Sequence, residues 1–378
     1  MIFIFWILIS YPFREEEYIG YLKNRDINFW LVFLVVLVYL MVLIIEISLK
    51  IRLNLLFIVL FFIIRVRDLI RFFLIYEIVF ILIIFSILVL GYRYERLIAG
   101  YLILFYSFLF SRPALIILIV FDYRFLFKNW LRFSFLLNYF LIGSFIVKFP
   151  IFGFHYWLPV AHVEASTIGS MILAGVLLKL GGIGVFYIVN YLSFMVKFHW
   201  LTIRVPLVIL IILSIRDLKI IIAYSSVAHI TIVFYVISVG RIIRKKGVLL
   251  IIIYHGFISP LIFWVVGMIA WWKTRSLMVV KIIRFSYVFI LVVFFLFILN
   301  MGFPPFMGFL REIFILKSLV LMKISIILLV VGVLLRCYYN IYLFWCFNNT
   351  IGIVFKLNFF ILDLFIFIFI ILVMNFYG

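Results

Sequence analysis

The chain has 378 residues, of which 70% are hydrophobic and 12% are charged, and its mean hydropathy is +1.43. A soluble fold of this size could not bury so much apolar surface, so the composition excludes a soluble globular protein. The formal net charge of +20 comes from lysines and arginines in the short joins between apolar runs, where such residues anchor the ends of membrane helices. Nucleic acid is therefore not an expected partner.

The apolar runs do not alternate apolar with polar residues, as the strands of a lipid-spanning barrel do, so helices are the remaining way to satisfy the backbone. We therefore expect an all-α polytopic membrane protein with about thirteen transmembrane helices. The expected spans are 29–48, 53–64, 70–90, 97–120, 133–156, 166–190, 201–215, 218–240, 247–270, 283–301, 304–322, 324–347 and 354–376.

Two lysines lie near the middle of apolar stretches that are long enough to cross a bilayer. Lys148 lies within residues 135–159, and Lys179 lies within residues 166–190. In a helix each would be roughly 16 to 20 Å from either end of its stretch, which is too far for the amine to reach the membrane surface. A lysine at the bilayer centre costs about 2.5–3.5 kcal/mol, so both lysines require a polar partner or a hydrated interior.

Redox centres and metal sites are not expected from the cysteines and histidines. Cys337 and Cys346 do not have the spacing of an iron–sulfur or zinc site. His155 and His162 lie near a helix end without further ligands close by in the sequence, so we expect no metal there. The glycines at 181, 182 and 184 follow no strand, so they predict a close helix-packing face rather than a phosphate loop.

Six motifs, in order along the chain, match one family of membrane proteins. They are LIYE at 74–77, ERLIAGYLILFY at 95–106, KFPIFGFHYWLPVAHVEASTIGSMILAGVLLKLGG at 148–182, DLKIIIAYSSVAHI at 217–230, YHGFISPLIF at 254–263 and GFPPFMGFLREIFIL at 302–316. In these motifs the chain resembles, over roughly residues 70–345, the chain-4 subunits of NADH:ubiquinone oxidoreductase, respiratory complex I. The sister chain-5 subunits typically carry a histidine in place of Lys179 and a lysine in place of Glu312, so the resemblance is to chain 4.

The resemblance implies an antiporter-like inverted repeat with two proline-broken helices. The expected breaks are at Pro150, close to Lys148, and at Pro304–Pro305, ahead of Glu312. Proline removes a backbone donor and clashes with the preceding turn, so a helix should end there and leave free carbonyls beside the charged residue. Such a break is tolerated in a membrane where it lines protein or water.

We expect one integral membrane domain over residues 1–378. It would comprise shortened amino-terminal helices at 1–69, an antiporter-like core at 70–347 and a carboxy-terminal helix at 348–378. The family usually has Lys and Pro where this chain has Val160 and Ser166, so the join there has lost a charge and a helix-starting proline.

The resemblance implies an ion pair between Glu77 and Lys148. Two opposite charges about 4 Å apart at an effective dielectric constant near 20 attract each other by about 4 kcal/mol, which is enough to decide whether a membrane lysine keeps its proton. Opening and closing the pair would then act as a protonation switch. The alternative is an ion pair that only packs two helices together.

Beyond this pair, the resemblance implies a lateral proton relay through Lys179, His229 and His255. Hydroxyl groups that would bind water along it are those of Tyr224, Ser225, Ser226 and Ser259. A lone buried histidine is often structural, and this alternative stays open for both histidines. For Asp217 and Lys219, which begin the span of His229, a capping or connecting role is an equal alternative to a direct one.

The function implied by the resemblance is proton conduction across the membrane, driven by quinone reduction elsewhere in the complex. The residues expected to carry it are Glu77, Lys148, Lys179, His229, His255 and, at the exit or coupling end, Glu312. Flavin, iron–sulfur clusters and quinone would belong to other subunits, so no cofactor is expected in this chain. The expected partners are lipid and neighbouring membrane subunits, notably the antiporter-like chains 2 and 5.

The residue usage adds a weak indication of the compartment. The 49 phenylalanines and 22 tyrosines are typical of an AT-rich organelle genome, which favours the mitochondrial inner membrane over a bacterial plasma membrane. Two rival functions are a free-standing proton/cation antiporter subunit and a membrane scaffold without transport. The four charged residues of the path (Glu77, Lys148, Lys179 and Glu312) argue against the scaffold. The chain-4 features at Lys179 and Glu312, together with the organelle-like composition, argue against the antiporter.

Overall fold

The protein is a bundle of apolar helices in the computed structural model. The described residues are 24–45, 50–66, 69–91, 95–120, 135–192, 200–238, 242–270, 276–277, 283–285, 287–303, 308–309, 312–313, 326–348 and 353–355.

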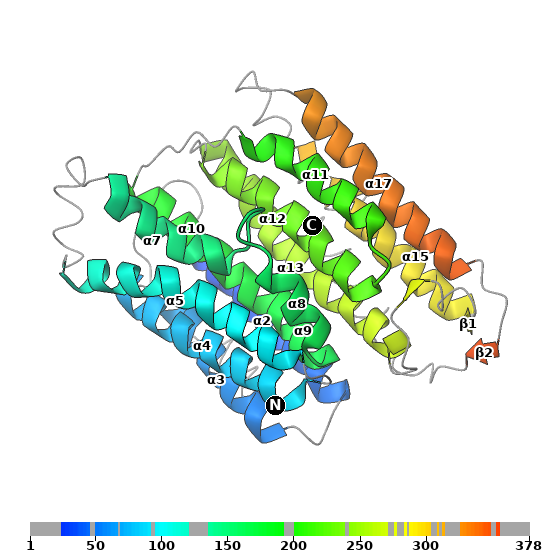
Figure 1. Ribbon diagram of the computed structural model, residues 1–378, viewed down its shortest axis with the longest axis horizontal. Coiled ribbons are helices and arrows are strands. Elements are labelled where there is room, and N and C mark those ends of the chain that lie inside the picture. The colour runs from blue at the N-terminus through cyan, green and yellow to red at the C-terminus, as the bar shows by residue number, and fades with distance from the viewer. Residues whose placement is uncertain are drawn as a thin grey trace.

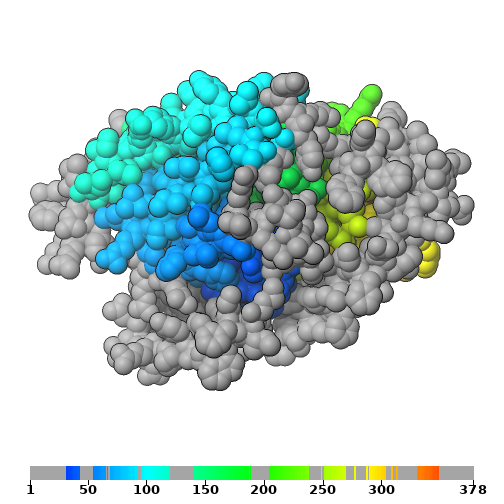
Figure 2. Space-filling model, turned by 90° about the horizontal axis from the view of Figure 1, so that it is seen from below, coloured from blue at the N-terminus to red at the C-terminus, as the bar shows by residue number. Residues whose placement is uncertain are grey.

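The amino-terminal helices pack side by side in sequence order. They are α2 (Asn24–Ile45), α3 (Lys50–Arg65), α4 (Leu69–Leu90) and α5 (Arg96–Val120). Each contacts the next, and Figure 1 shows them in blue to cyan along one side of the bundle. Large apolar side chains such as Phe62 and Ile81, both 59% exposed, cover their outer surface, which Figure 2 shows from below. A surface of this kind is suited to lipid.

The middle of the chain supplies the centre of the bundle. Its elements are α7 (Phe135–Lys148), α8 (Trp157–Glu164), α9 (Thr167–Ile172), the π-helical turn η2 (Leu173–Leu177), α10 (Leu178–Leu192), α11 (Trp200–Ser214), α12 (Leu218–Ser238) and α13 (Ile242–Ala270). Because α9, η2 and α10 follow one another without a gap, they form one long helix that is widened at its middle.

The side opposite α3 and α4 is formed by α15 (Tyr287–Met301) and α17 (Ile326–Asn348). These two helices pack on each other. They also pack on the central helices, since α17 contacts α11 and α15 contacts α13. A parallel pair of short strands, β1 (Ile283–Phe285) and β2 (Ile353–Phe355), lies near one end of the bundle, as Figure 1 shows.

Six helical segments in the described part of the chain are long and apolar enough to cross a membrane. The segments 167–186, 218–237 and 251–269 are 94%, 89% and 89% buried, whereas 69–89 is 44% buried. Central helices that are apolar all round and outer helices with an exposed apolar face are typical of a membrane bundle. The expectation of about thirteen spans goes beyond the described residues and stays a prediction.

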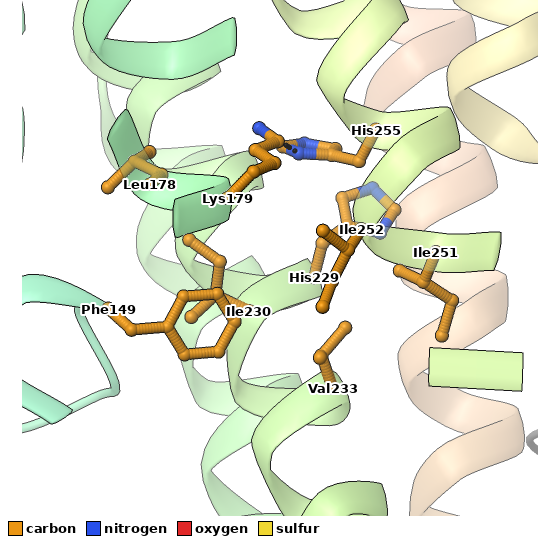
Figure 3. Close-up of a pocket in the computed structure, with 9 residues that line it drawn as sticks. All are labelled: Phe149, Leu178, Lys179, His229, Ile230, Val233, Ile251, Ile252 and His255. Carbon is orange, nitrogen blue, oxygen red and sulfur yellow. Dashed lines mark hydrogen bonds between the residues drawn. The ribbon is translucent and has the colours of Figure 1, made fainter. Parts of the chain in front are cut away.

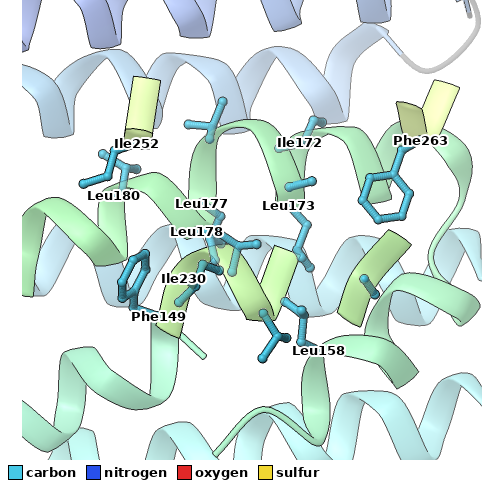
Figure 4. Packing of buried hydrophobic residues seen from close by; sticks show 14 of the residues in the cluster. Phe149, Leu158, Ile172, Leu173, Leu177, Leu178, Leu180, Ile230, Ile252 and Phe263 are labelled. Carbon is cyan, nitrogen blue, oxygen red and sulfur yellow. The ribbon is translucent and has the colours of Figure 1, made fainter. Parts of the chain in front are cut away.

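Apolar side chains from different helices interlock around η2 and α10. Figure 4 shows Leu158 of α8, Leu177 of η2, Ile230 of α12 and Phe263 of α13 in this packing. In lipid, helix association relies on close packing rather than on the removal of apolar surface from water. The glycines at 181, 182 and 184 confirm the expected packing face, because an added Cβ would lie 2.9, 2.8 and 2.2 Å from side-chain atoms of α4, of the join after α7 and of α7.

The structure corrects two of the expected spans. The stretch 133–156 is not one helix, because α7 ends at Lys148 and a separate short helix, α8, begins at Trp157. This confirms the expected break at Pro150. The span 283–301 begins with the short strand β1, and its helix, α15, begins at Tyr287. The all-α fold class is confirmed for the bundle, to which the β1–β2 pair is a small addition.

Other expectations fall wholly or largely outside the described part of the chain. They are the break at Pro304–Pro305, most of span 304–322 and the span 354–376.

Ser166 stands where the family usually has a proline, and it caps the amino-terminal end of α9. Its side chain accepts a hydrogen bond from Gly169 N at 3.1 Å. A serine cap of this kind is a common way to start a helix.

Candidate functional site

A carboxylate and a lysine from separate helices meet inside the amino-terminal half of the bundle. Glu77 Oε1 of α4 accepts a hydrogen bond from Lys148 Nζ at the end of α7. The lysine side chain is fully buried, whereas the glutamate side chain is 21% exposed. The predicted ion pair is therefore confirmed, and burial makes each charge depend on the other.

Three aromatic rings of α4 surround the same ammonium group. The Lys148 amine lies 4.9, 4.6 and 5.5 Å from the ring centres of Phe73, Tyr76 and Phe80. Contacts of this type contribute about 0.5–2 kcal/mol each, depending on solvation. The cage stabilises the charged lysine without binding its proton, so it leaves the carboxylate as the group that can take the proton.

The helix break after Lys148 is stabilised by side chains that replace backbone donors. Trp157 Nε1 donates to the Val147 carbonyl at 3.0 Å, and Arg204 Nη1 of α11 donates to the Phe152 carbonyl at 2.9 Å. Without these donors, the join would bury unsatisfied carbonyls. The break is therefore held in a fixed shape beside the lysine.

Lys179 has a different environment, at the centre of the bundle. Its Nζ donates to the Ala174 carbonyl and, at 3.2 Å, to Ser259 Oγ, and it lies 3.0 Å from His255 Nδ1. Ser259 Oγ also donates to the Ala174 carbonyl at 3.3 Å. These contacts are with neutral dipoles and an imidazole, so they hold an amine in either protonation state.

The close approach of two helices brings Lys179 to its partners. A Cβ added to Gly175 in η2 would lie 2.7 Å from Pro260 Cγ of α13, and one added to Gly256 would lie 2.3 Å from Leu34 Cδ1. A larger residue at either position would force its neighbours to shift. The π-helical turn lies in the same place, and single turns of this type are frequent at functional sites.

The two predicted relay histidines lie next to each other. The ring centres of His229 in α12 and His255 in α13 are 4.9 Å apart, and both side chains are buried. Figure 3 shows His255 in contact with Lys179 and His229 below it. The structure thus brings Lys179, His229 and His255 into one cluster, as the sequence predicted.

A small cavity lies against this cluster, with about 10 Å³ of space for water. Its lining residues are Phe149, Leu178, Lys179, His229, Ile230, Val233, Ile251, Ile252 and His255 (Figure 3). This volume is close to the lower limit for one water molecule. Phe149, which follows Lys148 directly, forms part of the cavity wall opposite the two histidines.

The last predicted residue, Glu312, is paired with an arginine that the sequence analysis did not identify. Arg336 Nη1 of α17 donates to Glu312 Oε1 at 2.8 Å, and the arginine side chain is 3% exposed. Gly302, with φ of +78°, ends α15 beside them, and a Cβ on it would lie 3.1 Å from Glu312 Oε1. A lone arginine inside an apolar span is the same signal that identified the two lysines.

Polar side chains extend from the Glu312 pair toward the centre. Asn340 donates to the Arg336 carbonyl at 3.0 Å, and Asn300 donates to Asn340 Oδ1 at 3.1 Å and to the Tyr339 hydroxyl at 3.3 Å. Tyr339 also interacts with Ser225 of α12, one helical turn before His229. This network joins Glu312 to α12, the helix of His229.

The four predicted hydroxyl groups have different surroundings. Ser259 bonds to Lys179, as described above, and thus belongs to the cluster. Ser225 and Ser226 each donate to a carbonyl of their own helix at 2.7 Å, and Tyr224 packs edge-on against the join between α7 and α8. Asp217 caps α12 through the backbone N–H of Lys219 at 3.2 Å, which bears out the capping alternative for the aspartate.

A metal centre has no support in the described residues, since no group of three or more histidine, cysteine, aspartate or glutamate side chains lies close enough to hold an ion there. Every charged group of the site instead faces another side chain or a backbone carbonyl. What this arrangement can do chemically is to accept, hold and pass protons.

Curated relatives and solved structures resemble this chain over most of its length. Chain 4 of NADH-ubiquinone oxidoreductase from Ascaris suum is 34% identical over 68% of this chain and 65% of its own length. The same chain from Rhipicephalus sanguineus is 34% identical over 85% of this chain and 71% of its own length. The chain thus spans slightly less than two thirds of the Ascaris relative.

Fold comparison gives a similar result. A chain in the structure described as respiratory complex I from Thermus thermophilus with bound NADH superposes with a TM-score of 0.76 at 18% identity, over 93% of this chain and 82% of that one. At this identity the likeness concerns the fold alone. Residues 66–337 match the sequence profile of the family described as NADH:quinone oxidoreductase/Mrp antiporter, TM. The chain therefore belongs to the NADH:quinone oxidoreductase/Mrp antiporter transmembrane family.

Proposed function

We propose that the chain is a proton-translocating membrane subunit of NADH:ubiquinone oxidoreductase. The observation that carries this proposal is the row of buried ionisable groups across the bundle: the Glu77–Lys148 pair, the Lys179–His255–His229 cluster and the Glu312–Arg336 pair. Ionisable groups inside a membrane are costly, and they mark proton or ion pathways. Three separate sets of ionisable side chains in one bundle are more than helix packing requires.

The proton would move laterally between these stations. Lys148 and Glu77 form a switch that exchanges a proton with water when it opens, and the cavity beside Phe149 links it to Lys179 and the histidines. Imidazole takes up a proton on one nitrogen and releases one from the other, so His255 and His229 are suited to pass it on. The Tyr339 and Asn300 network then leads to Glu312.

The partners and location follow from the same proposal. The chain would assemble with the neighbouring antiporter-like chains 2 and 5 in the mitochondrial inner membrane, and flavin, iron–sulfur clusters and quinone would reside in other subunits. It would therefore take part in NADH:ubiquinone reductase activity without redox chemistry of its own. The curated relatives named chain 4 of NADH-ubiquinone oxidoreductase support this assignment.

Purification from the native membrane tests the proposal against a free-standing antiporter or a scaffold. We expect the chain to migrate with NADH dehydrogenase activity on a native gel, and the assembled complex in vesicles to acidify one side when NADH is supplied. A chain that purifies without that activity would contradict the proposal. Transport that requires sodium instead of protons would identify an antiporter.

A further inference from the structure

A second set of buried ionisable side chains lies where α8 ends and α12 begins. His162, Glu164 and Lys219 are 0%, 1% and 2% exposed, and Lys219 Nζ donates to the Ala165 carbonyl at 2.9 Å. None of them belongs to the row of stations described above. Three ionisable groups buried together in a membrane bundle need an explanation beyond packing.

His162 is the most informative of the three. Neither of its ring nitrogens has a hydrogen-bond partner among the described residues. The ring stacks on Phe263 of α13, with centres 4.3 Å apart and planes 10° from parallel. A buried structural histidine normally uses its nitrogens in hydrogen bonds. A phenylalanine would make the same stack, so packing alone does not explain an imidazole at this position.

One face of α13 connects His162 to the central cluster. His255, Ser259 and Phe263 follow one another at intervals of one helical turn on that face. Lys179 contacts the first two, and His162 stacks on the third. The imidazole of His162 therefore lies about one turn, roughly 5.4 Å along α13, beyond the serine that binds Lys179.

A lysine lies on each side along the chain of contacts. Lys219 Nζ binds the Ala165 carbonyl at the end of α8, the helix that carries His162, and Lys179 binds Ser259, one turn of α13 before the phenylalanine on which His162 stacks. Lys219 lies in the first turn of α12, where Asp217, half-buried, accepts a hydrogen bond from its backbone N–H. Asp217 and Lys219 thus lie toward the end of the bundle, whereas Lys179 lies at its centre.

We propose that His162 carries protons between Lys219 and Lys179, which would open the relay to the α8–α12 end of the bundle as well as to the Glu77–Lys148 switch. The inference rests on the proposed transport function. A proton leaves the Lys219 ammonium for one ring nitrogen, and the other ring nitrogen gives its proton to the neutral amine of Lys179, with one bridging water at each step. A charged ring buried against Phe263 is costly, so His162 holds the proton briefly.

Replacing His162 with phenylalanine in the assembled complex separates stacking from proton transfer. His162→Phe preserves the stack on Phe263 but cannot take up a proton. We expect assembly to be retained and NADH-driven proton transport to fall about a hundredfold or more, the lower end of what a positioned acid or base contributes. The control Phe263→Leu removes the stack and keeps the imidazole, so transport should stay near normal. Normal transport by His162→Phe would overturn the inference.

Chemical rescue provides a second, independent readout. His162→Ala leaves a space in which added imidazole can bind, so imidazole should restore transport to this variant and not to His162→Phe. An assembled His162→Ala complex that imidazole does not restore would also reject the inference. Lys179→Met serves as the reference: normal transport by that variant would reject the proposed function itself, whereas a defect there with normal His162→Phe rejects only the role of His162.

Discussion

The two membrane lysines are held in contrasting ways. Lys148 has a carboxylate partner, Glu77, and a cage of three aromatic rings, all of which favour its charged form. Lys179 is held by a carbonyl, a hydroxyl and an imidazole. Dipoles of this kind compensate a buried charge less completely than an ion pair does. Lys179 is thus the lysine that gives up its proton more readily.

This contrast assigns different tasks to the two halves of the site. The Glu77–Lys148 pair can store a charge and change state when the pair opens, because breaking a buried ion pair is costly. The Lys179 cluster can pass a proton at smaller cost, because His255 and Ser259 can bind either an amine or an ammonium and no ion pair has to be broken. A charge switch beside a neutral relay is an arrangement that moves protons in steps.

The largest effect should follow from loss of the amine in the relay. Lys179→Met replaces it with an apolar chain of similar length, so the complex should assemble while proton transport falls about a hundredfold or more. Transport and NADH oxidation would be measured together in vesicles. A fully pumping, assembled variant would make this lysine structural.

The ion pair should show strong coupling between its partners. Glu77→Gln leaves the Lys148 charge buried without a carboxylate, and loss of one partner of a buried pair typically costs about 3–5 kcal/mol. The double variant Glu77→Gln, Lys148→Met should therefore be less defective than the sum of the single losses. We would compare transport and assembly in all three variants. Strictly additive losses would mean that the two residues do not interact in the working complex.

The Glu312 station should depend on charge more than on side-chain length. Glu312→Asp can still reach Arg336 through a water at a cost of about 0–2 kcal/mol, so it should retain substantial transport. Glu312→Gln should not, both because the proton site is lost and because Arg336 stays charged and unpaired. The control is Glu312→Gln with Arg336→Met: improved assembly without recovered transport is expected. A pumping Gln variant would defeat this role.

The smallest effect concerns the glycines that bring the helices together. Gly256→Ala would place a methyl group 2.3 Å from Leu34 Cδ1 and 3.5 Å from Lys179 Cε, and overpacking of this kind costs about 1–3 kcal/mol. We expect lower thermal stability of the complex and a modest loss of transport. Gly332→Ala is the matched control, because its Cβ would meet only Val205 Cγ1, at 3.2 Å. Equal stability of the two variants would mean that Gly256 and Leu34 are not closely packed in the working complex.

Much of the site could be predicted from charges that stand out in an apolar sequence. Lys148, Lys179 and the break at Pro150 were evident because a buried amine and a proline inside a span both need compensation. The same argument applies to Arg336, a lone arginine in an apolar span. The sequence does not show that Arg336 pairs with Glu312, because it does not place α17 beside the segment that carries Glu312.

Tertiary contacts that lack a local pattern could not be predicted. The sequence does not show that α8 is a separate helix, because WLPVAHVE is short and joins two apolar runs without a break in hydropathy. Nor does it show the π-helical turn, which depends on how η2 packs against α13. The strands β1 and β2 are far apart in sequence and too short to give a period.

Exchange of each lysine for arginine tests the central contrast most directly. Arginine keeps its charge at all working pH values, so it can replace a lysine that serves as a partner charge but not one that must release a proton. In the assembled complex, Lys148→Arg should retain most of the NADH-driven proton transport through its pair with Glu77, whereas Lys179→Arg should be as defective as Lys179→Met. Normal transport by Lys179→Arg would contradict the account, since it would show that the central lysine never gives up its proton.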